Sequence, residues 1–164
     1  MIYYTIIETF LGKWALVCNN KGLVKIYLPN EKISLNTLKR DFPNQELMEY
    51  RSKFDAIKNQ LIEYFNGKRK NFDVEFDLET SPFYEKVLNE VYKVPYGCTA
   101  SYSFIANKFN NPKAVRAVGS ANARNPIPII IPCHRIISKS GGIGGYRGGL
   151  VMKEKLLRLE KQNI

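Results

Sequence analysis

Histidine and cysteine are scarce in this chain of 164 residues, which has one histidine, His134, and three cysteines, Cys18, Cys98 and Cys133. Three cysteines cannot form a paired disulfide framework, because at least one must stay unpaired. One histidine among widely separated cysteines gives no zinc-site spacing, so we expect no metal ion and no other cofactor. Each cysteine is therefore either a core residue or a reactive thiol.

A long hydrophobic run is also missing. The longest apolar stretch, residues 126–133, is interrupted by prolines and is far shorter than the ~20 residues of a membrane helix. Glu8 follows a short apolar run without a basic lead-in, which argues against a secretory signal. Hydrophobic residues make up 45% of the chain and charged residues 24%, as in ordinary globular proteins. We expect a soluble, cytoplasmic protein of one or two domains with no membrane contact.

Acidic residues are few in the second half of the sequence. Residues 81–164 contain 13 Lys and Arg against 4 Asp and Glu, whereas residues 1–80 contain 12 against 11. This asymmetry favours a domain that binds a polyanion such as nucleic acid. A basic face that only keeps the protein in solution is the alternative interpretation.

The first 80 residues combine strand patterns with one helical pattern. Apolar residues at every third or fourth position predict a helix over residues 46–65. Alternating apolar and acidic residues predict a half-buried strand over residues 72–76. Three further strands are expected over residues 3–7, 14–18 and 23–28, with a hairpin turn between the last two.

A second unit is expected to begin near residue 80, where the charge balance changes. Ser81 and Pro82 form a favoured helix start, and this helix is expected to end near residue 94. Two short helices across a tight turn then predict a helix-turn-helix unit, over residues 102–109 and 112–122. A last helix is expected over 150–161. The predicted fold is α/β: a small N-terminal sheet domain with a helix, then a mostly helical domain containing the helix-turn-helix.

Small side chains dominate the second of these short helices, and Arg116 is its one long side chain. Small residues let a helix approach either a neighbouring helix or a nucleic-acid groove, and the pattern alone leaves both open. The lone arginine is accordingly either a solvated charge or a DNA contact.

The proline-rich segment 125–137 surrounds Cys133. Its three prolines restrict the backbone, so we expect a stiff, buried, extended segment that holds the cysteine in one position. A thiol beside cationic or imidazole groups can have a lowered pKa, and the thiolate is a nucleophile. Neighbouring side chains on an extended chain point to opposite faces, so His134 would need a turn or a bridging water to assist. An inert buried cysteine beside a core histidine is the alternative.

A loop with six glycines follows at residues 140–149. Such a loop lets the backbone approach a ligand closely, although glycine-rich loops are also ordinary connections. In the final helix Glu160 lies near the C-terminal end, where the helix dipole disfavours a carboxylate. Glu160 is therefore expected either to pair with a partner or to face solvent.

Together these motifs resemble the O6-alkylguanine-DNA alkyltransferase family. The resemblance is strong over about residues 80–161 and concerns only architecture over the first 80. It implies a structural, ribonuclease-H-like α/β domain over residues 1–79 and a DNA-binding, alkyl-acceptor domain over residues 80–164. The motifs that carry it are Asn125-Pro-Ile-Pro, Ile-Pro-Cys133-His-Arg-Ile, Pro95-Tyr-Gly with Ser101-Tyr102, Ala-Val-Arg116-Ala-Val-Gly, Gly-Tyr146-Arg-Gly-Gly and Lys153-Glu154.

The resemblance implies direct-reversal DNA repair. An alkyl group such as methyl would pass irreversibly from O6 of guanine, and also from O4 of thymine, to Cys133, so that each molecule acts once. His134 would take the thiol proton through a water, and Glu160 would orient the imidazole. Tyr102 would donate a hydrogen bond to a ring nitrogen of the leaving guanine, and Asn125 would brace the active-site turn.

The resemblance also implies that a monomer binds double-stranded DNA through the minor groove. Arg116 would fill the space left by the nucleotide that rotates out of the stack. Tyr146 and the glycine loop would form walls of the pocket, and backbone groups near Cys133 and Val151 would read the guanine edge. The implied substrate- and DNA-binding residues are Arg116, Ala117, Gly119, Arg135, Tyr146, Val151 and Lys153.

Three positions depart from the family pattern. Some relatives hold zinc in the N-terminal domain through Cys and His, whereas this domain has only Cys18 and no histidine. Cys98 stands where the family often has a polar or acidic residue, and adds a second thiol near the expected DNA face. Arg147, where some relatives have serine, is expected to restrict bulky adducts.

Two rival functions use the same residues. A non-enzymatic protein of this fold would flag alkylated lesions for another pathway, but proteins of that kind lack the acceptor cysteine. A transcriptional helix-turn-helix regulator would need side chains that read bases, and the small residues from Ala114 to Ala123 offer few.

Overall fold

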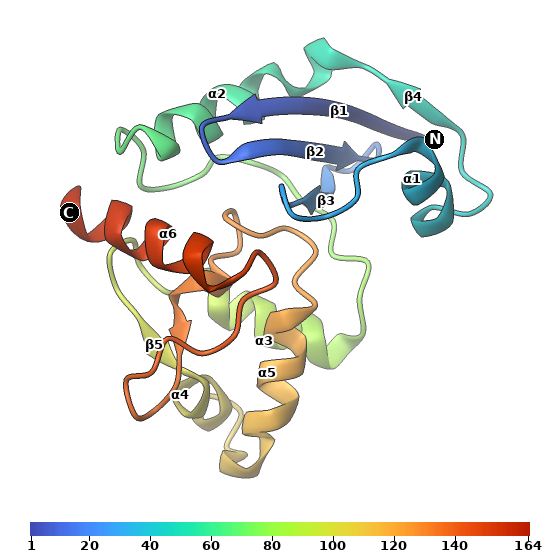
Figure 1. Cartoon of the computed structure of the whole chain (residues 1–164). Coiled ribbons are helices and arrows are strands. Elements are labelled where there is room, and N and C mark those ends of the chain that lie inside the picture. Colours follow the sequence, from blue (N-terminus) through green and yellow to red (C-terminus); the bar gives the residue numbers. More distant parts are fainter. The chain divides into compact units, whose positions relative to one another are not determined.

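The computed structural model describes residues 1–164, which divide into two compact units, Met1–Leu78 and Glu79–Ile164 (Figure 1). Sheet dominates the first unit and helices dominate the second, which confirms the predicted α/β class. None of the helices combines the length and the apolar character needed to cross a membrane.

The N-terminal unit contains a four-stranded sheet in the order β3-β2-β1-β4. β1 (Ile2–Thr9) and β2 (Gly12–Cys18) form an antiparallel hairpin, and β2 pairs in the same way with β3 (Leu23–Tyr27). β4 (Leu47–Glu49) pairs with β1 in parallel at the other edge. The first three strands confirm the sequence prediction, because β-branched and aromatic runs suit a pleated, half-buried surface.

Two helices cover opposite faces of this sheet (Figure 1). Successive residues of a strand point to opposite faces, so Trp14 and Ala15 of β2 pack on different sides. Ala15 belongs to a hydrophobic cluster that includes a leucine of α1 (Leu35–Asp41). The Trp14 ring packs 5.3 Å from a phenylalanine ring of α2 (Asp55–Phe65). Both β2 residues are fully buried, which places the core of this unit on both sides of the sheet.

The helix predicted over residues 46–65 begins later in the structure. Its first residues form β4, and a 3₁₀ turn, η1 (Arg51–Phe54), precedes α2. The reason is tertiary, because the edge of β1 offers backbone groups to this segment. The Ile2 N–H donates to the Glu46 carbonyl at 2.8 Å, and the Tyr50 N–H donates to the Tyr4 carbonyl at 3.0 Å. Pairing with the sheet therefore outweighs the helical periodicity.

Two other local predictions need correction. Residues 72–76 form no regular strand, and only an isolated bridge joins Phe76 to Leu23. The polar stretch before residue 46 contains α1, which was not expected. Its N-cap is Ser34, whose hydroxyl accepts from the Thr37 N–H at 3.2 Å, and this capping serine was a usable signal.

The C-terminal unit is mostly helical, as expected, with a small parallel sheet. The Ser81 hydroxyl caps the first helix by accepting from the Tyr84 N–H at 3.3 Å, and Pro82 is its first residue. The elements are α3 (Pro82–Tyr92), β5 (Ala100–Ser101), α4 (Tyr102–Asn107), η2 (Pro112–Ala114), α5 (Val115–Ala123), η3 (Cys133–Arg135), β6 (Ile136–Ile137) and α6 (Leu150–Gln162).

α4 and α5 form the predicted helix-turn-helix pair, and α5 packs against both α3 and α4 (Figure 1). α5 buries Val118 and Ala121 on its packed face and exposes Arg116 and Ala117 on the other. The small side chains therefore allow close helix packing on the buried face of α5, and on its exposed face they leave the backbone close to the molecular surface.

Candidate active site

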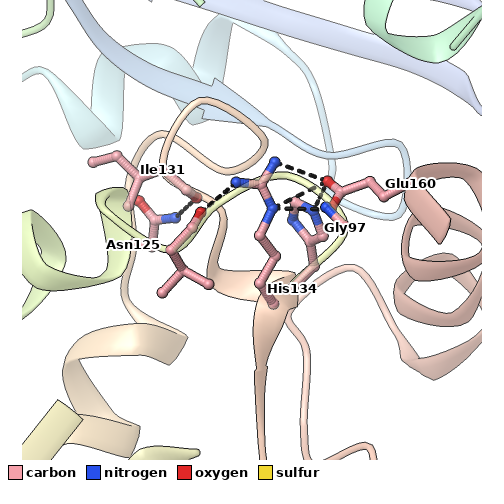
Figure 2. Close-up of polar contacts among 7 residues, drawn as sticks. Gly97, Asn125, Ile131, His134 and Glu160 are labelled. Carbon is pink, nitrogen blue, oxygen red and sulfur yellow. Dashed lines mark hydrogen bonds and ion pairs between the residues drawn. The ribbon is translucent and has the colours of Figure 1, made fainter. Parts of the chain in front are cut away.

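The proline-rich segment before Cys133 is buried, but it is not extended throughout as predicted. The Ile131 N–H donates to the Ile127 carbonyl at 2.9 Å, which closes a turn. Ile129 lies in this turn with φ of 75°, a conformation that strains a β-branched residue. The Asn125 side chain braces the turn from within, since Oδ1 accepts from the Ile127 N–H at 3.0 Å. Its Nδ2 donates to the Ile131 carbonyl at 2.8 Å (Figure 2).

A 3₁₀ turn, η3, then carries Cys133 and His134. The Arg135 N–H donates to the Pro132 carbonyl at 2.9 Å, so the chain turns directly after the last proline. Cys133 is 4% exposed and His134 is fully buried. The opposed directions expected for an extended chain therefore do not apply to these neighbours.

Burial controls the ionisation of the Cys133 thiol and raises its pKa. The Asn125 side chain and the positive charges of Arg147 and Lys153 act in the opposite direction, because they favour the thiolate. The neighbouring basic groups had suggested a lowered pKa for Cys133, but the effect of burial is larger and the net pKa is raised. The site holds a protonated thiol and surrounds it with groups that stabilise the anion once the proton leaves.

His134 and Glu160 form a buried pair in which His134 Nε2 lies 2.7 Å from Glu160 Oε1 (Figure 2). An ionised carboxylate only accepts hydrogen bonds, so Nε2 carries the hydrogen and the neutral ring has its lone pair on Nδ1. Burial lowers the pKa of His134, although the Glu160 carboxylate acts in the other direction. A neutral, oriented imidazole of this kind can accept a proton.

Three groups hold the Glu160 carboxylate. Besides His134, Arg135 Nε donates to Oε2 at 2.9 Å, and the Gly97 N–H donates to the same oxygen at 3.0 Å (Figure 2). Burial opposes the charge, but His134 and Arg135 outweigh it and lower the pKa of Glu160 to about 2. Glu160 therefore pairs with a partner, and the alternative of a solvent-facing acid is wrong.

Arg135 and Lys153, which the resemblance assigns to substrate or DNA contact, are both buried. Arg135 is 6% exposed and contacts Glu160, and its Nη1 donates to the Val94 carbonyl at 2.6 Å. Lys153 is fully buried, and its Nζ donates to the carbonyls of Ile136 at 2.6 Å and Gly145 at 3.2 Å. Burial lowers the pKa of Lys153 to about 8. Both cations stabilise the interior, so neither presents its charge on a DNA-binding surface.

A cavity of about 460 Å³ in the C-terminal unit has the size of a small-ligand site. Two of its lining residues reach toward Cys133. Asn122 Nδ2 donates to the Cys133 carbonyl at 3.2 Å. Burial raises the pKa of Tyr102, and Cys133 raises it further when its thiol has lost the proton. The lining residues are Tyr102, Gly119, Asn122, Ala123, Gly145, Tyr146 and Arg147.

Glycines let the 140–149 loop approach this cavity. Gly144 has φ of 69°, and a Cβ there would lie 3.2 Å from the Tyr102 hydroxyl. A Cβ on Gly148 would lie 2.7 Å from the Tyr146 ring. The loop therefore needs glycine for close packing of backbone against aromatic rings, as its composition suggested.

The remaining predicted residues lie on surfaces of the C-terminal unit. Arg116 and Ala117 are exposed on α5, and Val151 is 67% exposed at the start of α6. Cys98 is exposed as well, whereas Cys18 is buried in the N-terminal unit. No group of three or more His, Cys, Asp and Glu side chains is arranged to hold a metal ion.

Two family models together span almost the whole chain. The ribonuclease-like domain of 6-O-methylguanine DNA methyltransferase matches residues 2–78, and the DNA-binding domain of the same enzyme matches residues 82–162. The chain belongs to the 6-O-methylguanine DNA methyltransferase family. The family identified from the sequence motifs is thereby confirmed.

Relatives of known name agree with this family. A Methanosarcina mazei methylated-DNA–protein-cysteine methyltransferase is 42% identical over 99% of both chains. The inducible enzyme of that name from Bacillus subtilis is 44% identical over 87% of this chain and 80% of its own.

Solved structures of family members have the same fold. The Mycobacterium tuberculosis O6-methylguanine methyltransferase superposes with a TM-score of 0.87 at 35% identity, covering 100% of this chain and 95% of its own. Mycobacterium tuberculosis OGT in complex with DNA also gives 0.87 at 35% identity, covering 98% of this chain and 94% of its own.

Sequence reasoning missed Asn122. This residue is 5% exposed and lies four positions after Val118, on the packed face of α5. A polar residue in the apolar stripe of a helix was the available signal, but the small neighbouring side chains concealed the stripe.

Proposed function

We propose that this chain repairs alkylated DNA by direct reversal and that Cys133 accepts the alkyl group. Like its relatives, the chain is a methylated-DNA–protein-cysteine methyltransferase. One observation carries the assignment of the acceptor: a buried cysteine directly precedes the histidine of the buried His134–Glu160 pair, and its carbonyl accepts from Asn122, which lines a cavity for a small ligand.

The transfer begins with removal of the thiol proton. Neutral His134 accepts this proton through a water, and Glu160 holds the ring and stabilises the imidazolium that forms. Asn125, Arg147 and Lys153 stabilise the resulting thiolate, as the direction of their effects on the Cys133 pKa indicates. The high resting pKa keeps the sulfur protonated and unreactive until a substrate is in place.

The alkyl carbon then moves from oxygen to sulfur. The thiolate electron pair forms the new carbon–sulfur bond, and the pair of the breaking carbon–O6 bond goes to the leaving guanine. Tyr102 donates a hydrogen bond to a ring nitrogen of that guanine and so stabilises its negative charge. Water does not hydrolyse the carbon–sulfur bond of the thioether, so each molecule reacts once. We extend the proposal to O4-methylthymine, which presents a comparable alkyl–oxygen bond.

DNA is the macromolecular partner, in keeping with the DNA-binding domain match and the DNA complex of a relative. We propose further that α5 lies in the minor groove, where its low exposed surface fits, and that a monomer is sufficient. Exposed Arg116 would occupy the space of the rotated nucleotide, and Ala117 and Gly119 would allow close approach. The cytoplasmic location expected from the sequence stays a prediction.

The N-terminal unit has a structural role in this proposal, because its core is apolar and the acceptor site is built from the other unit. The two rival functions fit less well. A lesion-binding protein would not need an acceptor cysteine, and a regulator would need base-reading side chains on α5.

Intact-protein mass spectrometry after mixing with a duplex that contains one O6-methylguanine tests the proposal. The wild-type chain is expected to gain one methyl group, and Cys133→Ser none. Cys98→Ser is the matched control, because it removes an exposed thiol of the same unit, and it should be methylated like the wild type. An unmodified wild-type chain would overturn the proposed function. Stoichiometric methylation of Cys133→Ser would reassign the acceptor.

A further inference from the structure

Asn122 is the one polar residue on the packed face of α5. It is 5% exposed, and Val118 and Ala121 beside it are fully buried. Its side chain lines the cavity and donates from Nδ2 to the Cys133 carbonyl at 3.2 Å. A polar side chain at this position contacts the backbone of the alkyl acceptor directly.

Fold stability does not explain this residue. The Cys133 carbonyl also accepts from the Ile136 N–H, so it stays hydrogen-bonded without Asn122. The Asn122 Oδ1 atom is buried and has no hydrogen-bond partner. A buried acceptor in this state is costly, and an apolar side chain of similar size would avoid the cost. The amide therefore has a role other than packing.

A second contact of the same amide points to that role. Asn122 hydrogen-bonds the Tyr102 hydroxyl and acts to lower the pKa of Tyr102. Because Asn122 Oδ1 has no hydrogen-bond partner, Nδ2 is the donor and the phenol oxygen is the acceptor. Burial raises the same pKa and keeps the hydroxyl protonated. An oxygen that accepts from Nδ2 keeps its own hydrogen for another partner, and Tyr102 faces the cavity.

We propose that Asn122 is a positioning residue for the transfer reaction. Its two N–H bonds link the backbone of Cys133 to the hydroxyl of Tyr102 and direct the Tyr102 hydrogen toward the base in the cavity. The inference rests on the proposed function, because it needs a leaving base that gains negative charge. Asn122 acts through two neighbours: the backbone of the residue that carries the attacking sulfur, and the Tyr102 hydroxyl that faces the cavity for the leaving base.

Asn122→Leu tests this role, because it keeps a similar volume and removes both N–H bonds. The single-turnover rate constant for methyl transfer is expected to fall about ten- to a hundredfold, as for loss of a group that orients a reacting residue. The thermal midpoint and the affinity for unmethylated duplex should stay at or above wild-type values. Asn89→Leu is the matched control on exposed α3 and should react at the wild-type rate. A wild-type rate for Asn122→Leu would overturn the proposal.

A double-mutant cycle with Tyr102→Phe separates positioning from general damage to the site. If Asn122 acts in part through the Tyr102 hydroxyl, Asn122→Leu should slow the Tyr102→Phe protein clearly less than it slows the wild type, and the remaining effect should come from the lost bond to the Cys133 carbonyl. Equal effects in the two backgrounds would show that Asn122 does not act through Tyr102 and would overturn the proposal. If Asn122→Leu lowers the thermal midpoint, Asn122→Ala is used in the same cycle.

Asn122→Asp provides an independent readout. Its carboxylate accepts the Tyr102 hydrogen and turns it away from the base, so transfer at neutral pH should be slower than in Asn122→Leu. A faster rate than in Asn122→Leu would contradict the proposed direction of the hydrogen bond. Methylation of Cys133 is also measured at the end point in every variant. A wild type without the methyl group would refute the proposed function. Methylated proteins with unchanged rates would refute only the role of Asn122.

Discussion

The two units of this chain differ most in what their cores contain. In the N-terminal unit Trp14 and Leu61 are fully buried, and Thr5 is the one buried polar residue. The C-terminal unit buries six polar and charged side chains: Asn122, Asn125, His134, Arg135, Lys153 and Glu160. Burying such groups is costly unless they are paired, and chemistry at a site requires them. The comparison shows that buried polar side chains identify the reactive C-terminal unit better than its excess of Lys and Arg does.

Among substitutions at residues other than Cys133, Glu160→Gln should disturb the buried polar groups of the C-terminal unit most. The variant keeps the shape but leaves Arg135 without its counter-charge, and it replaces one of the two oxygens that accept from His134, Arg135 and Gly97 with an NH2 donor. We expect the methyl-transfer rate to fall by roughly a hundredfold and the free energy of unfolding by about 3 kcal/mol. Single-turnover kinetics and urea unfolding at pH 7 measure the two effects. A wild-type rate would show that the pair has no part in the reaction.

The pH dependence of stability sharpens the same prediction. Glu160 titrates at about 2 in the folded chain instead of 4.5, so the unfolded state binds the proton first as the pH falls. Its stabilisation is complete above pH 4.5 and is lost as the pH falls toward 2. The difference in unfolding free energy between the wild type and Glu160→Gln should shrink over this window. A constant difference from pH 5 to pH 2 would contradict the assigned direction of the pKa shift.

The N-terminal strands and the helix caps at Ser81 and Pro82 were predictable, because strand propensity and capping are local properties. β4 and the late start of α2 were not, because they depend on pairing with the edge of β1. The same limit applies to the site. The motif around Cys133 identified the family, but the buried positions of Arg135 and Lys153 depend on tertiary packing, and the resemblance alone had assigned both residues to substrate or DNA contact.

Arg116→Ala has an intermediate expected effect, on the exposed face of the same unit. Losing the side chain that replaces the rotated nucleotide should slow repair in duplex DNA about tenfold, since unstacking a base costs a few kcal/mol. Reaction with the free O6-methylguanine base should keep its rate, because no nucleotide needs to rotate. Rates for both substrates are compared under identical conditions. Equal slowing of the two would refute the role of Arg116 as a replacement for the nucleotide.

Leu61→Ala should have the smallest effect on the reaction while still damaging the N-terminal core. Leu61 is fully buried, and its truncation should lower the free energy of unfolding by about 2–5 kcal/mol. The transfer rate per folded molecule should change by less than about twofold, because the residue belongs to the structural unit. Urea unfolding and single-turnover kinetics on the folded protein test both parts. A rate loss like that of Glu160→Gln would erase the distinction between the units.

Peptide mapping of the wild-type chain after reaction tests the central claim most directly, because it locates the transferred group. The chain is mixed with excess duplex containing O6-methylguanine, digested, and analysed by tandem mass spectrometry. We predict one S-methyl group per molecule, on Cys133, with Cys18 and Cys98 unmodified. Methyl on either of those two cysteines, or on none, would contradict the account.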